Sequence, residues 1–355
     1  MTGRVFCTSI TSNYLGFIGP LRESLTKSGN IEELIVLIAD FDISSIGKGF
    51  NGIQFISLKE INNPLVADMA IYFSPGELAN ALKPFCIEYV LNKTAVDQLI
   101  YIDCDLFFIN KLPDLFATAE MSNKKIIFTP HITKALSMLD RIPKEIDIVD
   151  MGILNGGFIA VKKDPDTFEI LQWMKERFAY FGFDDRKNGY FLDQKLLPLL
   201  ITLFPSKLGI DFSENLNIAF WNAHERNVYE KDNTYWIDNK PVIFFHMSGV
   251  KINGKNNEIC QYLSEFENQT LISRSPWLLG VLVRYRSLID VFSTEITNWP
   301  YKFVSYNNIT LFPAIRRFYF KNRKMNKYAV PEAKLIMIHK LKLLNRYIRK
   351  TLKIS

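Results

Sequence analysis

The sequence predicts an α/β fold with a mostly parallel central sheet flanked by helices. Short runs of β-branched, aromatic and aliphatic residues suit strands that are buried on both faces. Between these runs, apolar residues recur at helical spacing, so strand and helix alternate as they do in βαβ units. The 355 residues are 48% apolar and 23% charged, a composition that can bury a large core.

The first βαβ unit is predicted over residues 5–39. Its two strand-like runs are residues 5–10 and 34–39. The apolar residues between them recur at helical spacing, namely Leu15, Ile18, Leu21 and Leu25. We expect Asn13 to cap this helix and Gly29 to end it.

Polar residues follow both strands of this unit. Ligands of open parallel sheets bind at the carboxyl ends of the strands. Thr8 and Asn13, near the end of the first strand, therefore belong to a predicted nucleotide pocket. Helix capping is the alternative role for such loop residues, and it is the role we favour for Asp40.

The almost unbroken apolar run at residues 99–109 carries two carboxylates, Asp103 and Asp105. On one strand they would point to the same face and repel each other, and burying either charge is costly. A divalent cation such as Mg²⁺ or Mn²⁺, sharing its coordination with phosphate oxygens, would remove both costs. The alternative is that both carboxylates end a strand and face water. The apolar flanks favour the metal site.

A helix is predicted from Ser74, because Ser-Pro-Gly-Glu has the form of a capping box with proline at the first helical position. Pro84 is expected to kink it. Lys83, beside the kink, could reach a phosphate, and a solvated lysine is the alternative.

Two glycines open the apolar strand predicted at residues 154–161. Gly156 and Gly157 would let another backbone or a ligand approach closely. Asn155 beside them could hold a sugar hydroxyl. The preceding segment, residues 133–150, has a weak pattern and is either an active-site flap or a surface loop.

Three further sets of polar residues follow. Asp193 and Gln194 lie near the first turn of a predicted helix, where an acid can also simply favour the helix dipole. Residues 215–224 form an aromatic and polar loop that suits sugar stacking or plain packing. A last buried strand, predicted over residues 242–251, runs into three residues with the spacing of a phosphate-binding turn, His246, Gly249 and Lys251.

The net charge of +6 is unevenly distributed. Residues 313–355 carry 13 Lys and Arg and one acid, Glu332, so the remaining chain is mildly acidic. Residues 316–321 mix aromatic and basic side chains as interfacial segments do. Further on, a basic stripe runs beside apolar residues at helical spacing, namely Met337, Leu341, Leu344, Ile348 and Leu352. This pattern predicts an amphipathic helix on an anionic membrane surface, and packing on its own domain or a second subunit is the alternative.

No apolar run reaches transmembrane length, and the N-terminus lacks the features of a signal peptide. Four scattered cysteines are expected to be reduced, partly buried thiols of a cytoplasmic protein, namely Cys7, Cys86, Cys104 and Cys260. Because the body is acidic, we expect no nucleic-acid partner. We divide the chain into a catalytic domain (1–265), a helical connecting region (266–312) and a basic amphipathic tail (313–355).

The order of these motifs resembles that of a GT-A glycosyltransferase, most closely the family 8 retaining type, which includes glycogenin and the bacterial lipooligosaccharide galactosyltransferases. The resemblance covers roughly residues 4–255. It rests on four motifs in order, Asp103-x-Asp105, Leu154-Asn155-Gly156-Gly157, Leu192-Asp193-Gln194 and His246-x-x-Gly249-x-Lys251. It implies a Rossmann-like domain that binds a nucleotide-sugar.

The resemblance also implies roles for individual residues. The ligands of Mn²⁺ or Mg²⁺ would be Asp103, Asp105 and His246, and Asp103 would also bind the ribose. The diphosphate would be held by Gly249 and Lys251, and Lys83 sits where the family places a donor-binding arginine. The residues beside the donor sugar would be Asn155, Gly156, Asp193 and Gln194, with catalytic roles for the last two. Where family 8 members carry an acidic base-binding residue, this chain has Thr8-Ser9-Ile10-Thr11.

The implied reaction is hexose transfer from a UDP-sugar to a glycan or lipid-linked acceptor of surface polysaccharide or lipopolysaccharide synthesis, with retention. The enzyme would be peripheral on the cytoplasmic face of the inner membrane. A phosphatase with Asp103 as nucleophile and Asp105 as acid is an alternative, although Phe107 stands where that chemistry uses Thr or Val. A catalytically inactive membrane-bound scaffold that binds sugar nucleotides is another, and the presence of all three metal ligands argues against it.

Overall fold

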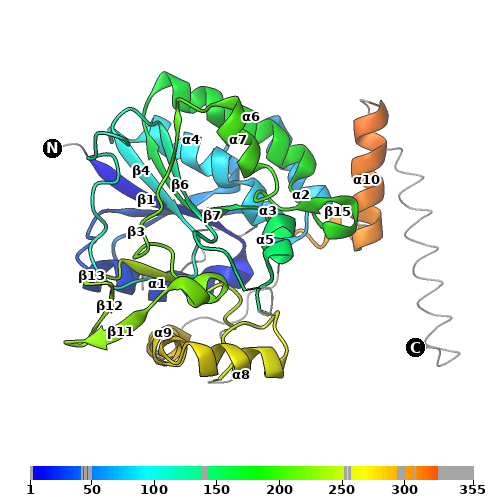
Figure 1. Cartoon of the computed structure of the whole chain (residues 1–355). Coiled ribbons are helices and arrows are strands. Elements are labelled where there is room, and N and C mark those ends of the chain that lie inside the picture. Colours follow the sequence, from blue (N-terminus) through cyan, green and yellow to red (C-terminus); the bar gives the residue numbers. More distant parts are fainter. Residues whose placement is uncertain are drawn as a thin grey trace, which may run out of the picture.

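A seven-stranded sheet forms the centre of the molecule in the computed structural model (Figure 1), which describes residues 3–40, 43, 46, 50–137, 142–251, 254, 257–293, 301–306 and 309–326. Its strands, in spatial order, are β10 (Leu208–Ile210), β6 (Ile126–Pro130), β7 (Leu154–Lys162), β4 (Gln98–Ile102), β1 (Arg4–Ile10), β2 (Leu34–Ile38) and β3 (Ile53–Ser57). Every neighbouring pair is parallel except the two that β7 makes with β4 and β6. This confirms the predicted mostly parallel sheet.

Helices cover both faces of this sheet (Figure 1). One face packs on α2 (Pro64–Tyr72), α3 (Pro75–Ala81), α4 (Lys83–Lys93), α6 (Pro165–Phe181), α7 (Leu197–Leu203) and α10 (Pro313–Asn326). The other packs on η1 (Ser12–Phe17), α1 (Ile18–Lys27) and α9 (Trp277–Ser293). On β4, Leu99 and Tyr101 enter the first core and Ile100 and Ile102 the second, so the strand is apolar on both faces.

The remaining elements are short. They are η3 (Leu58–Glu60), β5 (Leu106–Phe108), α5 (Glu145–Met151), β8 (Asp184–Asp185), η4 (Arg186–Asn188), β9 (Tyr190–Phe191), η5 (Phe220–Glu225), β11 (Val228–Lys231), β12 (Thr234–Ile237), β13 (Lys240–Pro241), β14 (Phe244–His246), α8 (Glu265–Arg274), β15 (Ser305–Tyr306) and β16 (Ile309–Thr310). The pair β5 and β14 is antiparallel and lies outside the central sheet.

The apolar run at residues 99–109 is two strands, which corrects the prediction of one. β4 ends at Ile102, a turn holds Asp103 and Asp105, and β5 then leaves the central sheet to pair with β14. Two carboxylates inside a strand that is buried on both faces would lack water and donors, whereas a turn at the carboxyl end of β4 gives them space. The strand predicted at residues 242–251 is likewise shorter and contains only Phe244–His246.

One capping prediction is confirmed and one is wrong. The Ser74 backbone N–H donates to Glu77 at 2.7 Å at the start of α3. The N-cap of η1 is Thr11 rather than Asn13, because the 3-10 turn already begins at Ser12. The kink expected at Pro84 is a full break between α3 and α4.

The first part of the predicted tail packs on the body of the protein. Arg316 of α10 is buried and donates to the carbonyl oxygens of Ile71 (2.8 Å) and Phe73 (2.6 Å) at the end of α2. Arg317 lies 3.7 Å from the centre of the Phe183 ring. The interpretation of residues 316–321 as an interfacial segment is therefore wrong. The amphipathic pattern from Met337 to Leu352 lies outside the described residues.

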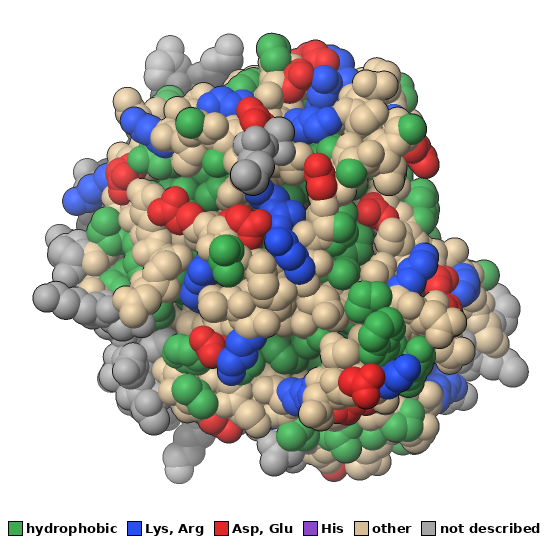
Figure 2. All heavy atoms as spheres, turned by 90° about the vertical axis from the view of Figure 1, so that its left-hand side faces the viewer, with side chains coloured by type: hydrophobic (Ala, Val, Ile, Leu, Met, Phe, Trp, Pro, Cys, Tyr) green, Lys and Arg blue, Asp and Glu red, His purple; other side chains and the backbone are tan. Residues whose placement is uncertain are grey.

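Charges on the surface that Figure 2 shows are mixed in sign, with Lys and Arg interspersed among Asp and Glu. In the part of the chain that the structure describes, no helix is both long and apolar enough to cross a membrane. All four cysteines are buried free thiols.

Candidate functional site

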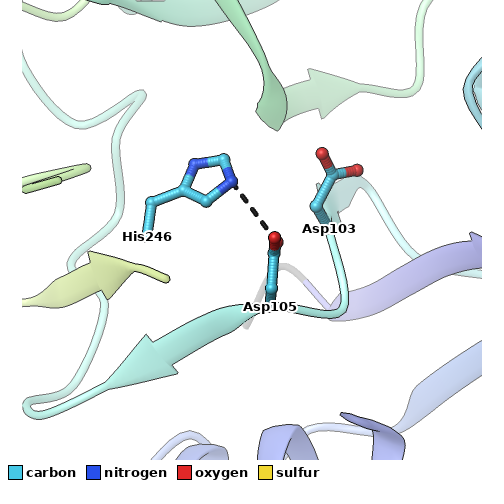
Figure 3. A group of neighbouring side chains, drawn as sticks. All are labelled: Asp103, Asp105 and His246. Atoms are coloured by element: carbon cyan, nitrogen blue, oxygen red, sulfur yellow. Dashed lines mark ion pairs between the residues drawn. The ribbon is translucent and has the colours of Figure 1, made fainter. Parts of the chain in front are cut away.

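Three predicted metal ligands meet at the carboxyl edge of the sheet (Figure 3). Asp103 and Asp105 rise from the turn between β4 and β5, and His246 ends the facing strand β14. One ligand atom from each side chain lies within 4.8 Å of the other two, and His246 Nε2 is 3.3 Å from Asp105 Oδ1. The pairing of His246 with Leu106 in the β5–β14 ladder brings together residues that are far apart in the sequence.

The imidazole of His246 is oriented by Asn217. Nδ1 of His246 lies 3.1 Å from Asn217 Oδ1, while the Asn217 amide nitrogen donates to Thr129 Oγ1 at 2.8 Å. An amide oxygen accepts hydrogen bonds, so Nδ1 of His246 is the donor to Asn217 and Nε2 is the ring nitrogen that faces Asp105. Nε2 lies 3.3 Å from Asp105 Oδ1, so both atoms can ligate one cation.

Gly156 and Gly157 allow this close approach, as predicted. A Cβ at Gly157 would lie 2.5 Å from His246 Cε1 and 2.9 Å from Asp103 Oδ2. A Cβ at Gly156 would lie 2.2 Å from Asp193 Oδ2. Glycine is therefore required at both positions of β7 for the acidic side chains to lie against the strand.

Lys83 joins two of the predicted site carboxylates. Its side chain is 1% exposed, and Nζ lies 3.0 Å from Asp193 Oδ2 and 3.3 Å from Asp103 Oδ1. It also donates to the Gly156 carbonyl oxygen at 2.9 Å. The alternative of a solvated lysine is thus excluded. Burial acts to lower the pKa of Lys83, but Asp103 and Asp193 outweigh this and hold the pKa above its usual value, so the ammonium stays charged.

The two carboxylates of the turn differ in their electrostatics. Burial raises the pKa of Asp103, and the opposing pull of the Lys83 ammonium does not cancel this. Burial acts in the same direction on Asp105, but His246 and backbone hydrogen bonding outweigh it and lower the pKa. Of the two carboxyl groups, Asp105 therefore has the lower pKa.

The residues present fit a divalent cation. Asp105 Oδ1 is a buried carboxylate oxygen without a hydrogen-bond partner, and so is Asp193 Oδ1. Buried charged oxygens are ordinarily satisfied by donors, and Asp105 Oδ1 has only the His246 Nε2 atom 3.3 Å away, so a cation bound between the two atoms would satisfy both. Two carboxylates suit Mn²⁺ or Mg²⁺, and the imidazole favours Mn²⁺ of these two. Asp103, Asp105 and His246 would hold it.

The other predicted donor-binding residues lie around this centre with differing exposure. Thr8 is fully buried in β1 and its hydroxyl has no hydrogen-bond partner, while Asn13 is exposed and accepts from Thr11 Oγ1 at 2.7 Å. Gly249 has a φ of +79°, the conformation that favours glycine, in the turn after β14. Lys251 is exposed, and its Nζ lies 3.7 Å from Glu258, which it would have to leave to meet a diphosphate.

Asn155 is positioned differently from its predicted role. It is fully buried, its Oδ1 accepts from the Gly157 N–H at 2.8 Å, and its amide nitrogen lies 3.0 Å from His131 Nε2. Nδ1 of His131 is in turn 2.6 Å from the Gly152 carbonyl oxygen. In this arrangement the protein's own groups hold both ends of the Asn155 amide, and its Oδ1 lies beside Gly157, against which His246 and Asp103 also pack. Burial lowers the pKa of His131 to about 4.

Asp193 and Gln194 lie in a turn before α7, which begins at Leu197, so they precede the helix instead of forming its first turn. Leu192 has a φ of +50°, which turns the chain after β9 and brings Asp193 under β7. Gln194 is half-buried, and a Cβ at Gly152 would lie 2.3 Å from its carbonyl oxygen. The segment from 142 to 152 therefore borders the site.

Trp221, in the loop for which sugar stacking and plain packing were the two expected roles, packs on two histidines. It is 5% exposed, and its ring meets those of His246 and His131 edge-on, at centroid distances of 5.0 and 5.4 Å. Sequence reasoning missed Asn217 and Glu225 as supports of the site. Glu225 accepts from the Thr133 N–H at 3.0 Å and so ties the flap segment to η5. The residues next to Asn217 and Glu225 in the sequence do not indicate which distant residues these two side chains contact.

No model of a known protein family matches the chain. Two proteins of Bacillus subtilis (strain 168) are similar to it, and both are uncharacterized. YfnF is 26% identical over 262 residues, covering 70% of this chain and 82% of YfnF. YfnD is 24% identical over 286 residues, covering 78% of this chain and 88% of YfnD.

Three solved glycosyltransferase structures are also similar. The galactosyltransferase LgtC, in complex with donor and acceptor sugar analogs, has a TM-score of 0.44 and 15% identity, and the match covers 80% of this chain and 99% of LgtC. GlyE of Streptococcus pneumoniae TIGR4 has a TM-score of 0.43 and 15% identity, and the match covers 85% of this chain and 66% of GlyE. A glycosyltransferase involved in glycosylation of the major capsid of PBCV-1 has a TM-score of 0.41 and 13% identity, and the match covers 69% of this chain and 93% of that enzyme. Similarity of this degree carries no information about the activity of this chain.

Proposed function

We propose that this protein is a metal-dependent glycosyltransferase that moves a hexose from a UDP-sugar to a glycan acceptor of surface polysaccharide or lipopolysaccharide synthesis. The observation that carries the proposal is the convergence of Asp103, Asp105 and His246 at the carboxyl edge of the sheet, with an orphaned carboxylate oxygen on Asp105. The motif order that resembles family 8 glycosyltransferases supports it.

The site's charges suit the departure of a nucleoside diphosphate. When bound, a cation on the three ligands supplies positive charge where negative charge grows on the leaving group. Lys251, once it leaves Glu258, adds a second positive charge on the same side. The ammonium of Lys83 lies between the carboxylates of Asp103 and Asp193 and offsets their mutual repulsion.

The position of Asp193 favours a retaining reaction. Its carboxylate is buried and paired with Lys83 at 3.0 Å, and such a carboxylate is a poor general base. In a retaining transfer the bond from the anomeric carbon to the diphosphate breaks as the bond to the acceptor oxygen forms. The acceptor proton passes to a phosphate oxygen of the leaving group, so no protein base is needed. Asp193 and Gln194 then orient the sugar.

We also propose that the basic tail places the enzyme on the cytoplasmic face of the inner membrane. The chain beyond Asn326 carries the amphipathic pattern, whereas α10 belongs to the body. Full-length protein should pellet with vesicles that contain phosphatidylglycerol, and a chain that ends at Asn326 should stay in the supernatant. Equal pelleting of both would refute membrane binding through the tail.

The test of the reaction is release of nucleoside diphosphate from a panel of nucleotide-sugars, with Mn²⁺ or with a chelator. Wild type should turn over one donor, and chelator or Asp105→Ala should abolish that turnover. Metal-dependent donor binding without turnover, with or without a glycan acceptor, would indicate the inactive scaffold. Release of phosphate from simple phosphoesters would indicate the phosphatase and contradict the transferase.

A further inference from the structure

An apolar pocket of about 380 Å³ opens at the same edge of the sheet as the metal ligands. Figure 1 shows α5, which forms one of its walls, beside β7. The pocket lies where β6 and β10 end and β7 begins. Its lining residues are Pro130, Ile132, Glu145, Ile148, Val149, Ile153, Leu154, Ile210 and Phe212.

Large apolar side chains around this pocket are exposed to solvent. Phe212 is 61% exposed, Val149 59% and Ile153 46%, and Ile146 on the same short helix is 65% exposed. Contiguous exposed apolar residues that rim a concave site are typical of a surface that binds an apolar ligand. Exposing these apolar side chains to water has an unfavourable free energy, which a bound ligand would relieve.

The pocket offers little to a charged ligand. Glu145 is its single ionisable lining residue, and Oε1 of that side chain accepts from the Leu136 N–H at 3.0 Å. No cation lines the wall, so neither a diphosphate nor a nucleotide would be neutralised there. The occupant must be an uncharged hydrocarbon.

The pocket adjoins the reacting centre through three covalent or direct contacts. Leu154 in its wall precedes Asn155 and the paired glycines on β7. Lys195, which follows Gln194, donates to the carbonyl oxygen of Val149 at 2.8 Å. Ile148 packs in one cluster with Trp221, whose ring contacts His246. The wall of the pocket is therefore in direct contact with the segments that carry the Asp193–Gln194 turn and His246.

We propose that this pocket binds the hydrocarbon chain of a lipid-linked acceptor, so that the acceptor's sugar lies at the Asp193–Gln194 turn. The inference rests on the proposed glycosyltransferase function. Of the two reactants, the nucleotide-sugar is charged and is accounted for by the metal ligands and Lys251. The acceptor is the one that can carry an uncharged chain. Each methylene of that chain buried in the pocket strengthens binding about fourfold.

The first experiment measures binding and needs no turnover. Octyl β-galactoside and methyl β-galactoside, both below micelle-forming concentration, are titrated calorimetrically into full-length protein. We expect the octyl compound to bind at least tenfold more tightly. Val149→Asn and Phe212→Asn, both at exposed positions that tolerate polar residues, should remove most of this difference. The matched control Val291→Asn replaces a 69% exposed valine on α9, the helix that packs on the other face of the sheet, and should not.

The second experiment compares KM for acceptors that share one sugar and differ in chain length. Val149→Asn should raise KM for the octyl acceptor about tenfold or more and leave KM for the methyl acceptor and slow donor hydrolysis unchanged. Turnover without any chain-length effect overturns the pocket proposal and leaves the transferase intact. If binding depends on chain length but no donor is turned over, the pocket proposal stands and the transferase proposal is contradicted.

Other occupants would give different results. If a second copy covers the pocket, Val149→Asn should convert a dimer to a monomer in analytical ultracentrifugation. If the chain's own C-terminal residues cover it, wild type should bind octyl and methyl galactoside equally. Either result overturns the proposal.

Discussion

Two carboxylates at the same edge of the sheet, Asp40 and Asp105, have opposite surroundings. Asp40 follows β2 and accepts hydrogen bonds from the Ser12 N–H (2.7 Å), the Ser12 hydroxyl (2.8 Å) and the Lys302 N–H (3.0 Å). Asp105 follows β4 and has an orphaned oxygen that faces an imidazole nitrogen. Asp40 is satisfied by its own chain and serves the fold, as its predicted capping role requires.

The difference shows that burial of a charge does not by itself mark a functional residue. What separates the two carboxylates is the supply of donors. Three hydrogen-bond donors satisfy the carboxylate of Asp40. The carboxylate of Asp105 instead lies beside a second acid, a histidine and a glycine-containing strand. A site that the chain leaves incomplete is one that a ligand completes.

Substitution of the two carboxylates should separate activity from stability, and this is the largest effect we expect. Asp105→Asn should lower nucleotide release by about 10³-fold, because a metal ligand is lost, and lower the free energy of unfolding by less than Asp40→Asn does. Asp40→Asn should cost about 1–3 kcal/mol of stability and leave the rate within a few-fold. Urea denaturation and the release assay check both, and similar losses of stability in the two variants would erase the distinction.

Lys83→Met should destabilise the protein by about 3–5 kcal/mol, because Asp193 would remain as a buried, unpaired charge. Urea unfolding measures this. Lys175→Met is the matched control, since its partner Glu88 is 27% exposed and can return to water, and we expect a loss near 1 kcal/mol. Adding Asp193→Asn to Lys83→Met should recover part of the stability. Additive losses in the double variant would contradict the pairing.

Gly157→Ala should destabilise by up to about 3 kcal/mol and weaken Mn²⁺ binding about 10–100-fold, because the new methyl displaces His246 and Asp103. Thermal unfolding and Mn²⁺ titration by calorimetry provide the readouts. Gly76→Ala is the control, since nothing lies within 4 Å of its added Cβ. Unchanged Mn²⁺ affinity in Gly157→Ala would mean that the metal does not use these side chains.

The stability of wild type should fall by about 2 kcal/mol more between pH 7.5 and pH 5 than that of His131→Gln. The pKa of His131 is lowered from 6.5 to about 4 by burial, so between these values the unfolded chain binds the extra proton and the folded protein does not. Stability therefore rises with pH in this window. Urea denaturation at both pH values tests this, and His224→Gln, at an exposed histidine, should retain the wild-type dependence.

The order of elements and the candidate metal ligands could be predicted because each has a local signal. A strand that is buried on both faces appears in the sequence as a continuous apolar run, and the capping box that begins at Ser74 can be recognised from four consecutive residues. Gly156 and Gly157 predicted close approach because no other residue permits it. These signals need no knowledge of which strands meet.

Contacts between distant segments could not be predicted. The turn at Asp103 and Asp105 depends on β5 finding β14, a pairing between residues more than 130 positions apart. Asn155 is buried because His131, which follows β6, offers its amide a partner. The burial of Arg316 likewise depends on the free carbonyl oxygens at the end of α2, which the composition of residues 316–321 does not reveal.

The hydrogen bond from Lys302 to Asp40 joins residues 262 positions apart. During synthesis on the ribosome, β1, β2 and the candidate metal ligands Asp103, Asp105 and His246 emerge before Lys302 does. Until then the Asp40 carboxylate can accept hydrogen bonds from Ser12 but lacks the one from Lys302. A nascent chain, or one released early, would therefore carry all three candidate ligands while its first βαβ unit still lacks one of its tertiary hydrogen bonds. The late arrival of this segment makes the C-terminal part of the chain a determinant of how firmly its beginning is folded.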